Sequence, residues 1–527
     1  MTKIIGFLIT KEENIPDIDF FDAGLNIITV KHNAYNIYLW GIGTIGEYII
    51  ENKYSLSFPL HANLLDRNIL ISFNNEEIIV ENDWLGSIPV FYNIKENIIS
   101  TLSNLCIKDK TIHPEGLSNF CEYGYSLFEQ TMFKDIKFMR FYSKLIISEK
   151  IEIEYKKDPA LDSSFLDYSS TEEEVISLMK EYVSSVENKI EGEIVLPTSG
   201  GYDSRLLNYL VTDKSKIRSF TYGISKNQSQ STEVIYAKKI SKMYNTKWEQ
   251  IELKKFHNYI DKWVNIYGIS THLHGMYHIE FYTEIVKNNN FDNASFLSGI
   301  GGDWWNGKIV MPDVFSFNEI GKIAHFNGMN LDIHYLKVKK RDDEDLKKFF
   351  EDNSFLLSSK YKNIVMARLK FLLISYLLEI PEYFGLPAWT PFLNYDIVKA
   401  TLNIPEERRK EIIWQKDFFK RVNLNLEEMG LDASKNNNLN YEIAKKTEFK
   451  LINIELMKVY IDEKRLTYIN RTLSKLTKYE ALKHSLLSIY IIGGVLRRLG
   501  LKKDYINALY EYYVIKVIEK GITYNAE

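Results

Sequence analysis

The segment Glu193-Ile-Val-Leu-Pro-Thr-Ser-Gly-Gly-Tyr-Asp-Ser-Arg-Leu-Leu-Asn-Tyr-Leu210 decides how the rest of the chain is interpreted. A short apolar strand runs into residues 199–204, where a helix begins. The two glycines allow a tight turn whose backbone N–H groups can approach an anion, and the helix N-terminus adds further donors. Ser199 and Ser204 add hydroxyls, and Asp203 beside a phosphate requires a cation such as Mg²⁺ between them. A turn with Asp203 as a helix cap is the simpler alternative, but it explains neither the glycine pair nor the two serines.

Strands and helices alternate around this segment. A helix is predicted from Thr171 to about Lys189, where Thr-Glu-Glu-Glu is typical of a helix N-terminus. The alternation continues to about residue 300 and indicates a parallel sheet with crossover helices, whereas the chain beyond residue 315 is mostly helical. The predicted strands are 192–197, 217–222, 248–253 and 294–297.

The first 155 residues have a β-rich pattern, in which short Ile, Val, Tyr and Phe runs are broken by Asn, Asp and Gly. Residues 157–170, with Pro159, three aspartates and two serine pairs, are the predicted linker between this region and the next. The predicted strands are 25–30, 36–40, 69–73, 77–80, 90–92, 98–101 and 145–153.

Composition limits the class of protein. The chain has 527 residues, 45% apolar and 26% charged, which is typical of a globular protein of two or three domains. A net charge of −4 gives no overall attraction to nucleic acid or to an anionic membrane. Cys106 and Cys121 provide no disulfide framework, and no apolar run is long enough to span a bilayer, so we expect a cytoplasmic protein.

Four segments in order carry a resemblance to a known family. Ser-Gly-Gly-x-Asp-Ser at 199–204 resembles the pyrophosphate loop of the ATP pyrophosphatase (adenine nucleotide α-hydrolase-like) enzymes. Ser-Gly-Ile-Gly-Gly-Asp at 298–303 resembles the Ser-Gly-Glu-Gly-x-Asp-Glu loop of asparagine synthetase, and Thr-Pro-Phe-Leu-Asn at 390–394 resembles its Pro-Phe-Leu-Asp stretch. Residues 219–223 with 231–237 resemble its second strand and the helix that follows. The chain is therefore similar to the asparagine synthetase family, which includes β-lactam synthetases and lasso-peptide cyclases.

The N-terminal region resembles the glutaminase domain of that family. Met-Thr-Lys-Ile-Ile-Gly-Phe at 1–7 is similar to its Met-Cys-Gly-Ile-Ala-Gly-Phe start, and residues 82–92 resemble one of its hairpins. The family's cysteine nucleophile is replaced by Thr2, and the glutamine-binding segments Asn-Arg-Gly-Pro-Asp and Tyr-Asn-Gly-Glu are missing. A hydroxyl is a weaker nucleophile than a thiol, so we expect a domain that has lost glutamine hydrolysis.

The loop at 298–303, which we call the second loop, also departs from the family pattern. The family's glutamate, or the tyrosine of β-lactam synthetases, is replaced by Ile300, and its final glutamate by Trp304. Ile300 can neither transfer a proton nor bind a substrate amine. The family's late catalytic lysine is best matched by Lys435, although an ordinary exposed lysine in the Asn-rich loop at 435–438 is an equal alternative.

Three other patterns have weaker support. Gly-Ile-Gly-Thr-Ile-Gly at 41–46 fits a dinucleotide fingerprint with Asp66 twenty residues further on, but the following chain favours hairpins over βαβ units. Residues 302–309 nearly spell a P-loop, with Ile309 in place of the Mg²⁺-binding hydroxyl. The spacing of the histidines at 272, 274 and 278 is loosely metal-like, but solvated or core histidines are favoured.

The resemblance implies a fold in two parts. Residues 1–160 would form an α+β, class II glutaminase-like β-sandwich, and residues 171–527 an α/β parallel-sheet synthetase domain with a helical extension. It implies ATP and Mg²⁺ as cofactors and an AMP-forming amide synthesis through an acyl-adenylate, with a possible homodimer. The expected ATP-binding residues are Leu196, Ser199, Gly200, Gly201, Asp203, Ser204, Tyr222 and Gly299, the metal ligands are Asp203 and Asp303, and the catalytic residue is Lys435.

Three functions stay open at this point. The first is an amidotransferase that joins free or partner-supplied ammonia to a small-molecule or peptide carboxylate. The second is a ring-closing ligase, of the β-lactam synthetase or lasso-peptide cyclase type, in which the substrate provides its own amine. The third is a catalytically silent scaffold.

Overall fold

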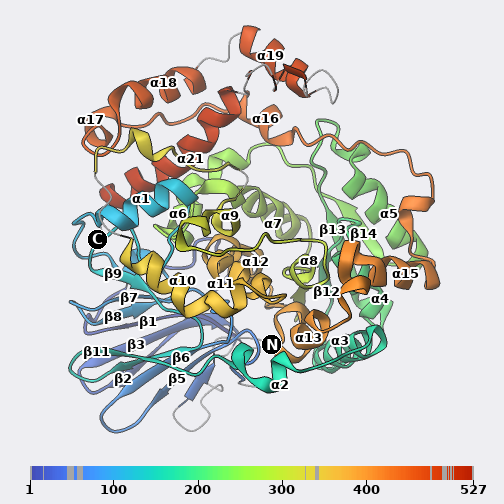
Figure 1. The fold of residues 1–527 in the computed structure, drawn as a ribbon, viewed down its shortest axis with the longest axis horizontal. Coiled ribbons are helices and arrows are strands. Elements are labelled where there is room, and N and C mark those ends of the chain that lie inside the picture. The colour runs from blue at the N-terminus through green and yellow to red at the C-terminus, as the bar shows by residue number, and fades with distance from the viewer. Residues whose placement is uncertain are drawn as a thin grey trace.

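The computed structural model describes residues 3–15, 17–43, 53–55, 63–326, 328–338, 343–474, 478–488, 495–496, 498, 501 and 504–524. An antiparallel region forms one side of the molecule, and a parallel-sheet α/β region with many helices forms the rest (Figure 1). Within the described ranges, no helix combines the length and the apolar character needed to cross a membrane.

Two antiparallel sheets make up the N-terminal region. Their order is β2-β3-β1-β8-β7-β9 and β11-β10-β6-β5-β4. Phe7 and Ile9 of β1 pack with Ile71 and Val80 of the other sheet, which makes the pair a β-sandwich with its own apolar core. The elements are β1 Lys3–Thr10, β2 Asn26–His32, β3 Tyr35–Ile42, β4 Lys53–Ser55, β5 Ile69–Phe73, β6 Ile78–Asn82, β7 Phe91–Asn93, β8 Ile98–Ser100, α1 Pro114–Tyr123, β9 Ile136–Phe138, β10 Ser143–Ile147 and β11 Ile151–Tyr155.

The β-rich pattern is therefore confirmed, although β1, β4 and β9 are not among the predicted strands. The predicted strand 145–153 is two strands, β10 and β11, which pair antiparallel from Ser143 opposite Tyr155 to Ile147 opposite Ile151. The turn between them contains Ser148-Glu-Lys150, without the glycine, proline or asparagine that usually marks a hairpin.

The second region is built on a five-stranded parallel sheet with the order β14-β13-β12-β15-β16. The predicted alternation and the four predicted strands are confirmed. Thr171 caps the first helix as expected, since its side chain accepts a hydrogen bond from the Glu174 backbone N–H. The elements are α3 Glu172–Glu187, β12 Ile194–Pro197, α4 Tyr202–Leu210, β13 Ile217–Thr221, α5 Thr232–Tyr244, β14 Lys247–Gln250, α6 Ile260–Tyr267, α7 Met276–Asn288 and β15 Ser295–Leu297.

The remainder is helical apart from the two-residue strand β16, as the sequence predicts. Some of these helices lie against the sandwich, and others lie on the side of the molecule away from it (Figure 1). The elements are α8 Gly302–Trp305, α9 Gly321–Ala324, α10 Glu344–Leu357, α11 Lys362–Ile374, α12 Tyr376–Tyr383, β16 Ala388–Trp389, α13 Tyr395–Leu402, α14 Glu406–Arg409, α15 Ile413–Arg421, α16 Leu439–Ala444, α17 Ile454–Met457, α18 Glu463–Ser474, α19 Lys478–Ser488 and α21 Asp504–Thr523.

The predicted linker is a packed segment. It contains the short helix α2, Ser163–Leu166, and Phe165 of that helix is fully buried. Asp158 forms an ion pair with the buried Arg368 of α11 at 2.6 Å. The composition of residues 157–170 is typical of a loop, but these contacts fix the segment between the sandwich and the helices.

Buried charges also join the two regions. Lys3 of β1 and Arg67, just before β5, both form ion pairs with Glu382 of α12. Trp84 donates from its indole Nε1 to the Leu393 carbonyl at 3.1 Å. A protein loses much of its folding stability when one partner of a buried ion pair is removed. These contacts therefore hold β1 firmly against the helical region.

Candidate functional site

A cavity of about 360 Å³ lies at the carboxyl ends of β12, β13 and β15. The chain first moves from β12 through β13 to β14, and then returns to place β15 on the other side of β12. Such a reversal of strand order opens a crevice at the carboxyl ends of the strands, where ligands of open α/β sheets bind. The volume is within the usual range of small-molecule sites.

Gly200 and Gly201, in the loop at 199–204, have different structural roles. Gly200 has φ +74°, and a Cβ there would lie 2.1 Å from the Tyr236 Cβ of α5. Gly201 has φ −63°, and a Cβ there would meet only the Ser199 hydroxyl, at 3.3 Å. Gly200 is therefore required by the fold, whereas Gly201 leaves open space on the cavity side.

The loop presents unpaired donors to that space. Gly201 is the N-cap of α4 and provides no side-chain cap, so the N–H groups of the first helical turn have no capping partner. The Ser204 hydroxyl donates to the Gly201 carbonyl at 3.1 Å, and the Gly201 N–H donates to the Ser199 hydroxyl at 3.3 Å. These bonds hold both serines at the cavity wall.

Arg205 supports the loop from behind, and sequence reasoning did not single it out. Its buried guanidinium donates to the Gly200 carbonyl at 2.8 Å and forms an ion pair with Glu427 at 2.8 Å. The partner lies 222 residues away in the chain, so only the folded structure shows this brace.

The second loop brings Asp303 to Asp203. The Oδ1 atoms of both carboxylates are buried and have no hydrogen-bond partner. A Cβ on Gly302 would lie 2.2 Å from Asp203 Oδ1, so glycine is needed for this close approach. Burial, followed by the charge of Asp303, raises the pKa of Asp203 well above its ordinary value.

This carboxylate pair fits a divalent cation. Two unpaired carboxylate oxygens beside an anion-binding loop are the ligands that Mg²⁺ uses when phosphates complete its coordination. Among the described residues, no cluster of three or more His, Cys, Asp or Glu side chains could hold a metal without such help. A bound polyphosphate would add further oxygen ligands to a cation at this point.

Aromatic side chains form the inner wall. The Tyr222 ring lies 5.1 Å from Phe281 and 6.2 Å from His278, measured between ring centroids. Burial lowers the pKa of His278 to about 3, so its imidazole is neutral at physiological pH. A wall of this type suits a flat apolar ring with a few hydrogen-bonding atoms.

Two further charged residues on the wall were missed by sequence reasoning. Lys308 places its Nζ 2.7 Å from Asp303 Oδ2. Glu233, at the start of α5, has a buried Oε2 without a hydrogen-bond partner, and burial raises its pKa. Lys308 lies five residues after Asp303, but that spacing alone does not show which way the loop turns.

Most of the predicted residues come together here. Ser199, Gly201, Asp203, Ser204, Tyr222, Gly299 and Asp303 all lie on the cavity wall. Leu196 is fully buried within β12 and Gly200 lies behind the loop, and neither belongs to that wall.

Lys435 also lies outside the cavity wall, with an exposed side chain. Its loop is fixed beside the segment after β13, since the Thr232 N–H donates to the Ser434 carbonyl at 3.0 Å. The Asn438 N–H donates to the carbonyl of Ile224, a cavity-wall residue, at 3.1 Å.

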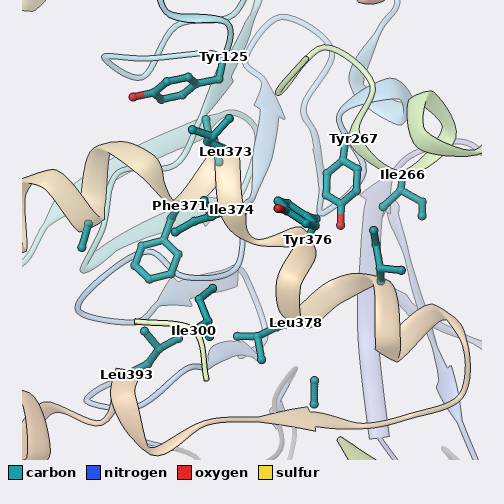
Figure 2. Close-up of a cluster of buried hydrophobic side chains, with 14 of the residues drawn as sticks. Tyr125, Ile266, Tyr267, Ile300, Phe371, Leu373, Ile374, Tyr376, Leu378 and Leu393 are labelled. Carbon is teal, nitrogen blue, oxygen red and sulfur yellow. The ribbon is translucent and has the colours of Figure 1, made fainter. Parts of the chain in front are cut away.

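The segment at 389–394, which contains the Thr-Pro-Phe-Leu-Asn motif, packs against the loop at 298–303. Trp305 donates from Nε1 to the Phe392 carbonyl at 2.8 Å, and the Ser298 N–H donates to the Trp389 carbonyl at 2.9 Å. Ile300 is buried, and Figure 2 shows it among Phe371, Leu378 and Leu393. Ile300 is thus part of an apolar cluster.

The structure also shows where the three histidines and part of the glycine fingerprint at 41–46 lie. His272, His274 and His278 are core residues, and burial is the main reason that their pKa values are lowered. Gly41 lies in β3, paired with Ile4 of an antiparallel neighbour, whereas residues 44–46 of the glycine fingerprint lie outside the described residues. Thr2 lies outside them as well.

No protein-family model matches the chain, and no curated protein matches it either.

Proposed function

We propose that this protein is an AMP-forming, ATP-dependent carbon–nitrogen ligase of the asparagine synthetase type. One observation carries the proposal: an uncapped, glycine-rich strand–helix turn lies beside two aspartates at the switch point of a parallel sheet, and the Oδ1 atom of each aspartate is buried without a hydrogen-bond partner. The turn suits a polyphosphate, the carboxylates suit its cation, and the aromatic wall suits a nucleobase.

Different residues of the cavity wall would bind the phosphates, the adenosine and the Mg²⁺ of ATP. The first-turn N–H groups of α4 and the hydroxyls of Ser199 and Ser204 would hold the β- and γ-phosphates. Tyr222 and Gly299 would lie beside the adenosine. Asp203 and Asp303 would hold Mg²⁺, which offsets the charge of the phosphates when it is bound.

The reaction we propose has two steps. An oxygen of the substrate carboxylate attacks the α-phosphorus of ATP, and the bond to the β-phosphate oxygen breaks, which gives an acyl-adenylate and pyrophosphate. The nitrogen of ammonia or of a substrate amine then attacks the acyl carbon, AMP leaves, and the nitrogen loses a proton. The protein contributes positioning and electrostatic stabilisation and no covalent nucleophile.

Ile300 limits what the second step can use. Because its apolar side chain is packed among Phe371, Leu378 and Leu393, it supplies neither a base nor a hydrogen bond to the amine. The proton of the nitrogen must leave to a substrate oxygen, to water or to another wall residue. An amine of the substrate and ammonia are both compatible with this wall.

The proposal is tested by the products made from ATP. The purified protein is incubated with ATP labelled at the α-phosphate, Mg²⁺, ammonium chloride and pools of amino, sugar and peptide carboxylic acids. We expect labelled AMP with an equal amount of pyrophosphate in at least one pool, and none from Asp303→Asn. Labelled ADP as the product, or equal AMP from the variant, would contradict the proposal. A pool that needs ammonium indicates an amidotransferase, and one that does not indicates a ring-closing or amine-bearing substrate.

A further inference from the structure

Lys308 holds a special place on the cavity wall. Among the described wall residues it is the only lysine or arginine, and its Nζ lies 2.7 Å from Asp303 Oδ2. Its side chain is 46% exposed, so the ammonium lies at the opening of the cavity and can still reach water. The ion pair is therefore available to exchange with ligands.

The turn before Lys308 is built to aim it. The buried Asn306 accepts a hydrogen bond from the Lys308 N–H at 2.8 Å and donates to Gln415 at 3.0 Å. Gly307 has φ +97°, and a Cβ there would lie 2.1 Å from the Arg409 carbonyl oxygen. This turn accepts glycine only, and it fixes the direction in which the lysine leaves the backbone.

Charge balance gives the lysine a role. Asp203 and Asp303 bring two carboxyl groups together, and negative charge on both would be costly without a nearby cation because both Oδ1 atoms are buried. Within the described part of the chain, Lys308 is the one lysine or arginine on this wall, and its ammonium forms an ion pair with Asp303. A divalent cation at Asp303 would repel that ammonium, while the polyphosphate of a nucleotide would attract it.

We propose that Lys308 is the resting counterion of the aspartate pair and becomes a ligand of the polyphosphate when Mg²⁺–ATP binds. The second half of this statement rests on the proposed function, and the first half does not. The four-carbon stem allows the ammonium to move without movement of the backbone. On the phosphates it would offset the negative charge that develops as pyrophosphate leaves.

The test compares Lys308→Met with Lys322→Met. Lys322 is a matched control, because it forms an ion pair with Glu319 at 2.6 Å, has a 45% exposed side chain and lies outside the cavity wall. Binding of Mn²⁺, a spectroscopic substitute for Mg²⁺, is measured by electron paramagnetic resonance without nucleotide and with ATP. Formation of AMP is measured with the acid pool that supports it.

Without nucleotide, we expect Lys308→Met to bind Mn²⁺ roughly fivefold more tightly than wild type, since a competing half-exposed ion pair is removed. With ATP, AMP formation should fall about a hundredfold. Lys322→Met should match wild type in both assays. Unchanged Mn²⁺ affinity in Lys308→Met would overturn the counterion role, and normal AMP formation would overturn the polyphosphate role.

The two proposals fail in different ways. If wild type makes no AMP but Lys308→Met still binds Mn²⁺ more tightly, the proposed function fails and the counterion role stands. If wild type makes AMP and the variant does so equally well, the function stands and the lysine acts only on the resting site. A variant that melts well below wild type is replaced by Lys308→Gln, which keeps a polar side chain of similar length.

Discussion

Replacing Gly201 with valine should abolish nucleotide binding and leave the fold intact. The backbone at Gly201 has φ −63° and ψ 164°, which any residue adopts. A Cβ would touch only the Ser199 hydroxyl, at 3.3 Å. The two methyl groups of valine would instead enter the cavity where the proposal places the phosphates.

The magnitudes separate these two effects. Loss of a glycine N-cap costs about 1 kcal/mol, and the stiffer unfolded chain returns about half of that, so the unliganded variant should melt within a few degrees of wild type. At a ligand concentration one hundred times Kd, wild type gains about 2.7 kcal/mol. The variant should gain almost none of it.

Differential scanning fluorimetry with and without ATP and Mg²⁺ measures both effects. Gly200→Ala is the contrasting variant, because φ +74° and a 2.1 Å approach to Tyr236 make it unstable even without ligand. An equal upward shift of the melting temperature in wild type and Gly201→Val would refute the assignment of the phosphate loop. A variant that is unfolded without ligand would refute the reasoning about open space.

Three other predictions follow from the same structure. Asp203→Asn and Asp303→Asn should each weaken Mg²⁺-dependent ATP binding about tenfold or more in calorimetry, and the double variant should lose little beyond either, because they share one ion; additive losses would contradict this. Lys435→Ala should form AMP within about threefold of wild type, because its side chain is exposed outside the cavity wall; a hundredfold loss at unchanged ATP affinity would show that its loop enters the site. Burial raises the pKa of Glu379 to about 7, so its charged form opposes folding and stability should fall as pH rises from about 4.5 to 7. Glu379→Gln should remove that fall and gain at most about 3 kcal/mol at pH 8 in urea unfolding, and an unchanged pH slope would be the contrary result.

Local rules predicted the parts of the fold that local forces determine. Thr171 caps α3 because its side chain and Glu174 lie within one helical turn. The central strand β12 could be predicted because it is an apolar run followed by the turn residues Ser199, Gly200 and Gly201. The hairpin between β10 and β11 was missed because the apolar alternation continues through a turn without glycine. The two-residue β16 was missed because so short a strand has no periodicity.

The residues of the candidate site also fall into those that a local sequence pattern reveals and those that only the folded structure reveals. Asp203 and the two serines could be predicted as site residues because a glycine-rich strand–helix turn is a local structure with a compact pattern, and all three lie on the cavity wall. Lys308 and Glu233 could not, because their direction depends on the turn at Gly307 and on the packing of α5. Arg205 could not either, since its partner Glu427 is distant in the chain.

The central claim is that a nucleotide and its metal bind between the two loops. A crystal structure with Mg²⁺ and an ATP analogue that cannot be cleaved between the α- and β-phosphates tests it most directly. We predict that the phosphates lie against the N–H groups at the start of α4, with the metal bound to both Asp203 and Asp303. A nucleotide bound elsewhere, or a metal that contacts neither aspartate, would contradict it.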